Sequence, residues 1–213
     1  MVRSWKGFMP PVSSSPFERY NRKKAILGLG SNLGERTENL LNGLRLISER
    51  CGELQSLSSI FETTPLTVPN VKQGPFYNLA VSISTSLSPE TLMTTLLQIE
   101  KEIGRKRGEE IHWGPRVLDI DIITYEGFTS RHGSLSIPHP RYRERDFVLL
   151  PLKEIAPDFK DPTSLESVDS MLAQISGDER TAYKRIPLPA EFKSLCSSEM
   201  DEEEDGSSYS EAV

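Results

Sequence analysis

Apolar and polar positions alternate along several short stretches of the chain. In residues 118–123, three aliphatic side chains alternate with Asp119 and Asp121. A period of two predicts a β-strand with one buried face and one polar face. Further strands are predicted, from alternation or apolar runs, at residues 24–29, 54–61 and 76–85, with a short ribbon at 128–137.

Helical periodicity separates these strands. Within residues 39–50, apolar side chains recur every three or four positions before a Cys-Gly pair. A second helix is predicted from Ser88, a candidate N-cap followed by Pro89, as far as Gly104. A last core helix is predicted at residues 148–155, and a peripheral helix around Met171, Leu172 and Ile175.

The order of these elements is β-α-β-β-α-β, with helices in the crossovers. It predicts an α+β fold with a ferredoxin-like βαββαβ core, in which helices pack on an antiparallel sheet. Beyond Phe159 the apolar pattern fades. We therefore expect a flexible basic leader at 1–23, a folded domain at 24–160, a peripheral extension at 161–195 and a disordered acidic tail at 196–213.

Charge is distributed unevenly along the chain. The formal net charge is −6, but residues 199–213 contain seven acids and no base. Residues 1–24 carry +5, so the presumed core is mildly acidic. Such a core has no broad basic surface for nucleic acid. No apolar run approaches the roughly 18 residues that a membrane span needs, so we expect neither nucleic acid nor membrane as a partner.

The leader and the cysteines bear on the compartment. The leader is basic and poor in acids, as transit peptides are, but three prolines interrupt the amphipathic helix that such signals prefer. Cys51 and Cys196 have no metal-ligand spacing and indicate inert thiols in a reducing compartment. We expect a cytoplasmic protein; the alternative is an organelle, if residues 1–23 are a transit peptide.

Asp119 and Asp121 form a candidate metal site. On a strand their Cα atoms lie about 6–7 Å apart on one face. Carboxylates at this spacing repel each other unless a cation lies between them, and magnesium shares such ligands with substrate phosphates. A bare Asp-x-Asp is more often a solvated strand face. Here Trp113-Gly114-Pro115-Arg116 precedes the pair and supplies an aromatic ring, a turn and a cation, which favours the metal site.

Three further groups of residues have candidate chemistry. Arginine forks suit phosphate oxygens, although any single arginine is more often a surface residue. The glycines of residues 28–34 join a strand to a helix, but their spacing does not match a dinucleotide motif, so a simple turn explains them equally well. Asn78 with nearby aromatics suits a flat heterocycle, although a Phe at a strand start is ordinarily core. The arginines are Arg105, Arg107, Arg116, Arg141, Arg143 and Arg145.

Several motifs occur in the order typical of one enzyme family. They are Gly30-Ser31-Asn32-Leu33-Gly34, Phe76-x-Asn78, Glu100 followed by Gly104-Arg105-x-Arg107, Trp113-Gly114-Pro115-Arg116-x-Leu118-Asp119-x-Asp121, and Pro138-His139-x5-Arg145-x-Phe147-Val148. Over residues 24–157 the chain therefore resembles the 6-hydroxymethyl-7,8-dihydropterin pyrophosphokinases of folate biosynthesis. The family fold is ferredoxin-like, in agreement with the predicted order of elements.

The resemblance implies an activity and a set of site residues. Pyrophosphate would pass from ATP to the hydroxymethyl oxygen of the pterin, with release of AMP. Asp119 and Asp121 would hold two magnesium ions, and Arg105 and Arg116 would complete the catalytic set. The ATP site would comprise Glu100, Arg107, Trp113, Arg116, Ile122, Ser136, His139 and Arg145. The pterin site would comprise Thr63, Thr64, Leu66, Phe76, Asn78, Trp113 and Phe147, with the two Phe rings on either side of the pterin.

Two departures from the family pattern and two alternatives stay open. The 105–113 loop is one residue longer than in compact bacterial members, and Ser134 stands where a basic residue is common. One alternative is a catalytically silent ferredoxin-like module that binds a nucleotide or RNA. The other is a different ATP-dependent transferase with the same metal clamp. We expect a monomer, because the sequence has no coiled coil or conspicuous apolar patch.

Overall fold

An antiparallel β-sheet runs through the centre of the computed structural model, which describes residues 22–65, 69–106, 108, 114–132, 135–177 and 181–196. Its strands follow the order β5-β1-β4-β3-β8, and β2 also pairs with β4. A separate two-stranded ribbon joins β6 to β7. The strands are β1 (Lys23–Ser31), β2 (Glu53–Leu57), β3 (Ile60–Thr63), β4 (Phe76–Thr85), β5 (Asp119–Tyr125), β6 (Ser130–His132), β7 (Leu135–Ile137) and β8 (Tyr183–Ile186).

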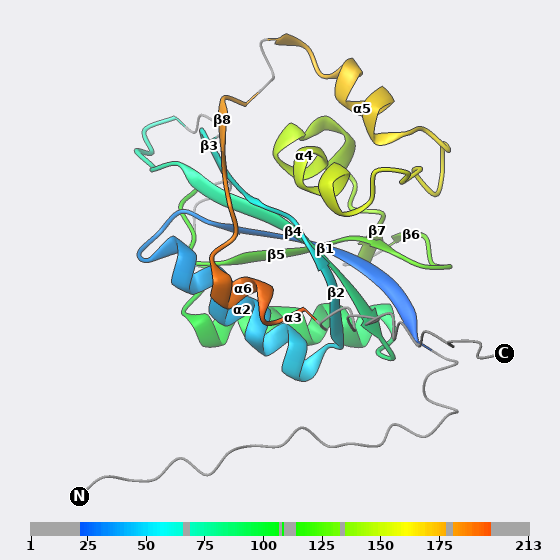
Figure 1. Cartoon of the computed structure of the whole chain (residues 1–213), viewed down its shortest axis with the longest axis horizontal. Helices are drawn as coiled ribbons and strands as arrows, with labels where there is room; N and C mark the ends of the chain where they lie inside the picture. Colours follow the sequence, from blue (N-terminus) through cyan, green and yellow to red (C-terminus); the bar gives the residue numbers. More distant parts are fainter. Residues whose placement is uncertain are drawn as a thin grey trace, which may run out of the picture.

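Helices cover both faces of the sheet. In Figure 1, α2 (Arg36–Arg50) and α3 (Pro89–Ile103) lie on one face, with the short α6 (Ala190–Lys193) beside them. The opposite face carries α4 (Asp146–Ile155) and α5 (Val168–Gln174), which follow the 3-10 helix η1 (Tyr142–Glu144). None of the described helices has both the length and the apolar character to cross a membrane.

Each face has its own hydrophobic core. Aliphatic side chains of β1, β4 and β5 meet those of α2 and α3 in the larger core, where Leu27, Leu44 and Leu96 are fully buried. The smaller core lies under α4 and α5 and includes Ile123 and Leu149. Because β4 lies between β1 and the β2–β3 pair and is covered on both sides, seven of its ten residues are buried. The face under α4 is covered only in part, which leaves room for a site.

Local signals fix the ends of α3. The Ser88 hydroxyl accepts a hydrogen bond from the backbone of Thr91, and Pro89 occupies the first turn, as the sequence predicts. Gly104 ends the helix in a left-handed conformation with φ of 113°. The next residue, Arg105, therefore leaves the helix at a defined point beside β5.

Most of the predicted elements are confirmed, with two corrections. The stretch 54–61 is two strands, because Ser58 interrupts it: its hydroxyl accepts from the backbone of Ala80 and donates to Ser59. Residues 161–195 are more than a peripheral extension. They contain the predicted helix, as α5, but also β8, which pairs with β3, and Phe192, which is fully buried in the larger core. Residues 1–21 of the predicted leader and 197–213 of the predicted tail lie outside the described residues, whereas Lys23 begins β1 and Cys196 packs against the larger core.

Both cysteines are free thiols. Cys51 is buried in the larger core, and this burial raises the pKa of its thiol to about 11. Burial also raises the pKa of the Cys196 thiol. Because the thiolate is the reactive form, both thiols are unreactive near neutral pH, as the sequence predicts.

Candidate active site

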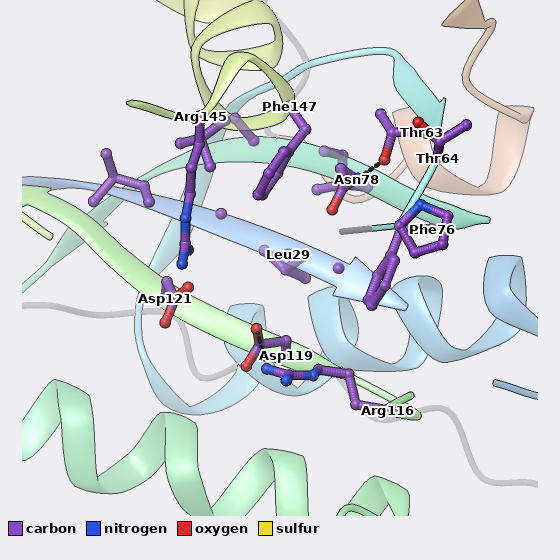
Figure 2. A pocket seen from close by; sticks show the side chains of 17 residues that line it. Leu29, Thr63, Thr64, Phe76, Asn78, Arg116, Asp119, Asp121, Arg145 and Phe147 are labelled. Carbon is purple, nitrogen blue, oxygen red and sulfur yellow. Dashed lines mark hydrogen bonds and ion pairs between the residues drawn. The ribbon is translucent and has the colours of Figure 1, made fainter. Parts of the chain in front are cut away.

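A pocket with about 810 Å³ of empty space opens on the sheet face that α4 covers only in part (Figure 2). Strands β1, β4 and β5 form its floor, and the end of β3 and the start of α4 form walls. The structure thus brings residues from five elements to one place. The predicted site residues that line it are Thr63, Thr64, Phe76, Asn78, Arg116, Asp119, Asp121, Arg145 and Phe147.

Glycines keep the floor of the pocket open. Gly28 pairs with Asp121 across the β1–β5 ladder, and Gly30 pairs with Asp119. Directly paired residues share a sheet face, so the aspartates have no side chain beside them on β1. A Cβ atom on Gly30 would lie 2.9 Å from the amide oxygen of Asn78. The sequence predicted a strand only as far as Leu29 and left open whether the glycines of residues 28–34 form no more than a turn. Both Gly28 and Gly30 lie inside β1, and their role follows from a register that spacing does not reveal.

Asp119 is held as a carboxylate by two arginines. Its side chain forms ion pairs with Arg105 and with Arg116, the latter at 2.9 Å between Nη1 and Oδ2. Burial alone would raise the pKa of the Asp119 carboxyl. The nearby charges of Arg116 and Arg105 outweigh this effect and lower that pKa below its ordinary value. The group is therefore an anion throughout the physiological pH range.

Glu100 supports this pair from behind. It is fully buried on α3, and its Oε1 accepts hydrogen bonds from Arg105 Nη1 and from the backbone N–H of Ile120, both at 2.7 Å. Arg105 is itself 7% exposed, so one guanidinium lies between the carboxylates of Glu100 and Asp119. Neither Glu100 nor Arg105 lines the pocket; they hold Asp119 and the start of β5 in place.

Asp121 has a different environment, although it is only two residues away. Its nearest ion-pair partner among the described residues is His139, with 3.8 Å between Nε2 and Oδ2. Burial and the charge of Asp119 raise the pKa of Asp121 to about 7. Burial and the neighbouring Arg145, which extends toward Asp121 in Figure 2, lower the pKa of His139 to about 4. At neutral pH the imidazole is uncharged, and Asp121 holds a proton much more readily than an ordinary carboxyl group.

The other half of the pocket suits a flat organic group. Figure 2 shows the rings of Phe76 and Phe147 projecting into the cavity from β4 and α4. Between them, Asn78 Nδ2 donates to the hydroxyl of Thr63 at 2.8 Å, which fixes the orientation of the amide. Two aromatic faces beside an oriented amide can bind a heterocycle by stacking and by edge hydrogen bonds.

Asn32 connects two segments at the rim of the site, a role that the sequence did not suggest. Its Nδ2 donates to Gln73 Oε1 and Gly74 O, both at 3.3 Å, just before Phe76. Its Oδ1 accepts from the backbone N–H of Arg116 at 2.8 Å. An Asn in a strand-to-helix turn was the only available signal, and turns commonly contain Asn without any such contact.

The remaining predicted residues that the structure describes do not line the pocket. Ile122 points away from Asp119 and Asp121, because side chains alternate along β5, and it is buried in the larger core. Only its backbone is available to a ligand. Ser136 lies on β7, and the backbone of the neighbouring His139 is tied to Ile123 of β5 at 2.9 Å. Leu66, Arg107, Trp113 and Ser134 lie outside the described residues.

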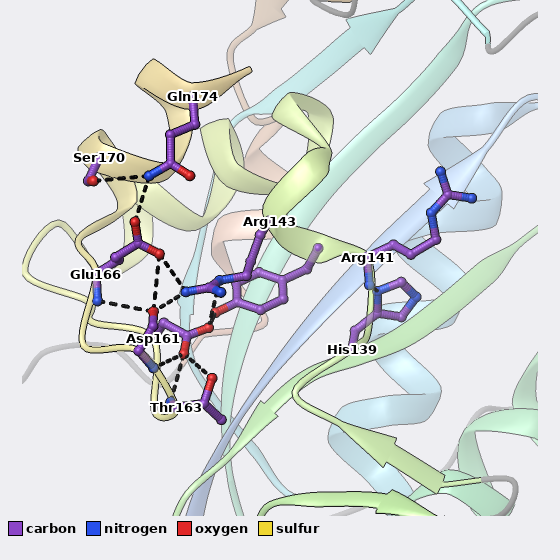
Figure 3. Close-up of polar contacts among 10 residues, drawn as sticks. His139, Arg141, Arg143, Asp161, Thr163, Glu166, Ser170 and Gln174 are labelled. Atoms are coloured by element: carbon purple, nitrogen blue, oxygen red, sulfur yellow. Dashed lines mark hydrogen bonds and ion pairs between the residues drawn. The ribbon is translucent and has the colours of Figure 1, made fainter. Parts of the chain in front are cut away.

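A buried carboxylate stabilises the turn between His139 and Arg145. Figure 3 shows Asp161 accepting hydrogen bonds from the backbone and hydroxyl of Thr163 and from the hydroxyl of Tyr142 in η1. Arg143 lies 3.1 Å from it through Nε. Burial alone would raise the pKa of Asp161, but the hydrogen bonds from Thr163 and Tyr142 prevail and hold that pKa well below its usual range.

The donor set fits a magnesium-type ion. Within the described part of the chain, no group of three or more His, Cys, Asp or Glu side chains is arranged to hold a metal. Asp119 and Asp121 instead offer two carboxylates on one face of β5. Magnesium is usually held by one or two carboxylates and completes its shell with phosphate oxygens and water. A cation here would also relieve the repulsion that raises the pKa of Asp121.

Comparison with known proteins identifies relatives. The model of the family described as 7,8-dihydro-6-hydroxymethylpterin-pyrophosphokinase (HPPK) matches residues 26–157. A Synechocystis protein named 2-amino-4-hydroxy-6-hydroxymethyldihydropteridine pyrophosphokinase is 38% identical over 168 residues, which cover 78% of this chain and 83% of the relative. The Dictyostelium discoideum folic acid synthesis protein FOL1 is 45% identical over 137 residues; they cover 64% of this chain but only 20% of that protein.

A solved structure supports the fold. Wild-type HPPK-DHPS from Plasmodium falciparum matches with a TM-score of 0.58 over 72% of this chain and 44% of that chain. Its sequence identity is 16%, so the likeness concerns the fold alone. Together with the antiparallel sheet and its helices, it confirms the predicted α+β class.

Metal binding should depend on pH through Asp121. Because its pKa is about 7, the carboxyl group of Asp121 must lose its proton before it can bind a cation. We expect Mn²⁺, titrated alone and followed by electron paramagnetic resonance, to bind about tenfold more weakly at pH 6 than at pH 8. Asp121→Asn should bind weakly at both pH values. Equal affinity of the wild type at pH 6 and 8 would contradict the assignment.

Asp161→Asn should destabilise the protein mainly above pH 4. The variant places an amide where several donors converge, and we expect the free energy of unfolding at pH 7 to fall by about 3 kcal/mol. A carboxyl with a lowered pKa in the folded state stabilises above its unfolded pKa of about 4 and loses this effect as the pH falls. Urea unfolding at pH 7 and pH 3 should therefore show a smaller difference at pH 3. The control Asp169→Asn alters only an exposed pair with Lys153.

Proposed function

The chain belongs to the 7,8-dihydro-6-hydroxymethylpterin-pyrophosphokinase family, and on this premise we propose how its pocket carries out pyrophosphoryl transfer in folate biosynthesis. The hydroxymethyl oxygen of 6-hydroxymethyl-7,8-dihydropterin attacks the β-phosphorus of ATP. The bond from that phosphorus to the oxygen bridging the α-phosphate breaks. AMP leaves, the pterin diphosphate forms, and the hydroxyl proton is released. One observation carries this proposal: a single pocket combines carboxylates paired with arginine and a slot formed by aromatic rings and an oriented amide.

The polar half of the pocket takes the phosphates in this proposal. Asp119 and Asp121 hold two magnesium ions, which neutralise charge on the phosphate oxygens when bound. Arg116 lines the pocket and already lies 2.9 Å from Asp119, so its guanidinium is oriented before ATP arrives. Arg105 adds a second positive charge beneath the same carboxylate. Positioning and charge neutralisation are the main requirements of phosphoryl-type transfer.

The remainder of the ATP site is assigned by position around this centre. Arg145 lines the pocket, and the uncharged imidazole of His139 lies outside this lining, with Nε2 3.8 Å from Asp121 Oδ2. Glu100 acts through Arg105, and Ile122 offers its backbone only. Ser136, Arg107 and Trp113 complete the proposed set on the resemblance alone.

The organic half of the pocket takes the pterin in this proposal. Phe76 and Phe147 stack on its two faces, and Asn78, oriented by Thr63, hydrogen-bonds its edge. The backbone of Thr64 and of Leu66 supplies further edge contacts. Because Gly28 and Gly30 leave the floor open, the pterin can approach the strand closely enough to place its hydroxymethyl group beside the phosphates.

Three broader features stay proposals. The ferredoxin-like plan follows if β2 and β3, which both pair with β4, are taken as one interrupted strand. We also propose a monomer, with ATP and the pterin as its partners. The proposed location is the cytoplasm, with an organelle as the alternative through residues 1–23.

Release of AMP tests the activity. We expect the wild type with ATP and magnesium to form AMP only when the pterin alcohol is present, as followed by ion-pair chromatography. Asp119→Ala should lower this rate by about 10³-fold or more, because it removes a metal ligand and takes from Arg116 its carboxylate partner, while Arg105 keeps Glu100. Asp169→Ala, on the surface of α5, is the control and should match the wild type.

The other products distinguish the alternatives. Formation of ADP would identify a kinase that uses the same metal clamp. Tight ATP binding without any product would identify a silent nucleotide-binding module. Near-normal AMP formation by Asp119→Ala would overturn the role of the carboxylate.

Gly30→Ala should weaken pterin binding. The new Cβ would lie 2.9 Å from Asn78 Oδ1, closer than real Cβ contacts, and would displace the amide that faces the pterin edge. Overpacking of this kind typically costs about 1–3 kcal/mol, so we expect the KM for the pterin to rise about tenfold or more. Gly177→Ala is the matched control, because its Cβ would meet no atom within 4 Å. An unchanged KM in Gly30→Ala would show that the floor tolerates a side chain.

A further inference from the structure

The two walls of the organic slot come from distant parts of the chain. Thr63 ends β3 and Thr64 follows it on one side, and Phe147 lies in the first turn of α4 on the other. The distance between these walls determines how tightly a flat ring binds, because the strength of stacking and of edge hydrogen bonds falls steeply with distance. A contact that ties one wall to the other would therefore control how well the pterin binds.

The segment just before β8 contacts the first wall. Strand β8 pairs with β3, with Tyr183 opposite Thr63. The ladder continues by one more bond, in which the backbone N–H of Thr64 donates to the carbonyl of Ala182 at 3.2 Å. The position of Thr64 in the pocket is thus fixed to the backbone that precedes β8.

The residue next to Ala182 contacts the second wall. The backbone N–H of Thr181 donates to Asp146 Oδ2, and its hydroxyl donates to Asp146 Oδ1, both at 2.6 Å. Asp146 is 5% exposed and is the first residue of α4, between Arg145 and Phe147. Two donors on one buried carboxylate form a charge-assisted pair, which is stronger than neutral hydrogen bonds. Adjacent residues of one segment therefore hold both walls.

We propose that Thr181 and Asp146 form a clasp that sets the distance between Phe147 and the Thr63–Thr64 edge, and that both are positioning residues for the pterin. This inference rests on the proposed function. Neither residue lines the pocket, so any effect on the reaction must pass through Thr64 and Phe147. Thr181 also lies beyond residue 157, where the match to the family model ends, so the family motifs contain no sign of it.

The Thr181 hydroxyl is the atom to remove. Thr181→Val keeps the shape of the side chain but leaves Asp146 Oδ1 without its donor, whereas Thr181→Ser keeps the hydroxyl. We expect the KM for the pterin to rise about tenfold in Thr181→Val, because small displacements of positioning groups have large effects. The KM for ATP should change by less than about twofold, and Thr181→Ser should resemble the wild type. Lys184→Ala, on β8 and exposed, is the matched control.

A second variant and a binding measurement complete the test. Asp146→Asn places an amide where two donors converge, so it should give the same selective loss even if Thr181→Val fails to fold. The dissociation constant of the pterin, measured by calorimetry in the presence of a non-hydrolysable ATP analogue, should rise in parallel with KM. An equal rise in both KM values, or loss of stability without a change in pterin affinity, would overturn the clasp. A wild type without pterin-dependent AMP formation would instead overturn the proposed function.

Discussion

The charge balance around Asp119 is the constraint on which the rest of the site depends. Glu100, near the C-terminal end of α3, lies close to Asp119 and Asp121 at the start of β5, and Glu100 is fully buried. Burying one carboxylate without a partner costs several kcal/mol, so cations must be placed there by the fold. Arg105 lies between Glu100 and Asp119, and Arg116 pairs with the other oxygen of Asp119. Among the described residues Asp121 has no ion pair with an arginine within 4 Å, and we propose it as the partner of a metal ion.

This balance explains features that lie outside the charged group itself. Arg105 is in place because Gly104 ends α3 one residue earlier, and Arg116 because Asn32 accepts a hydrogen bond from its backbone. Gly28 and Gly30 on β1 lie opposite the aspartates and keep the floor of the pocket free of side chains. Helices thus cover the sheet closely on the face of α2 and α3. On the other face, α4 covers it only in part and leaves the pocket open.

How much of this was predictable depends on how local each signal is. The alternation around Asp119 and Asp121 and the caps of α3 are local, and both were predicted from sequence. The floor role of Gly28 and Gly30 depends on the β1–β5 register. The place of the Ile122 side chain on the rear of β5 leaves only its backbone for the ATP site that the resemblance implied. Strand β8 was missed because its exposed, charged residues show no apolar alternation. It is held in the sheet by backbone pairing with β3, which the sequence pattern does not reveal.

The two halves of the pocket therefore differ in how they are built. The polar half is assembled from residues 100–121 and the turn at Asn32, so its geometry is encoded within and near the motifs that recur in the family. The organic half has one wall on β3 and the other on α4, and the contacts of Thr181 and Ala182 join them from the C-terminal part of the chain. In the proposed function, contacts far from the motifs therefore act on recognition of the heterocycle, while the buried charges of the polar half do not depend on them.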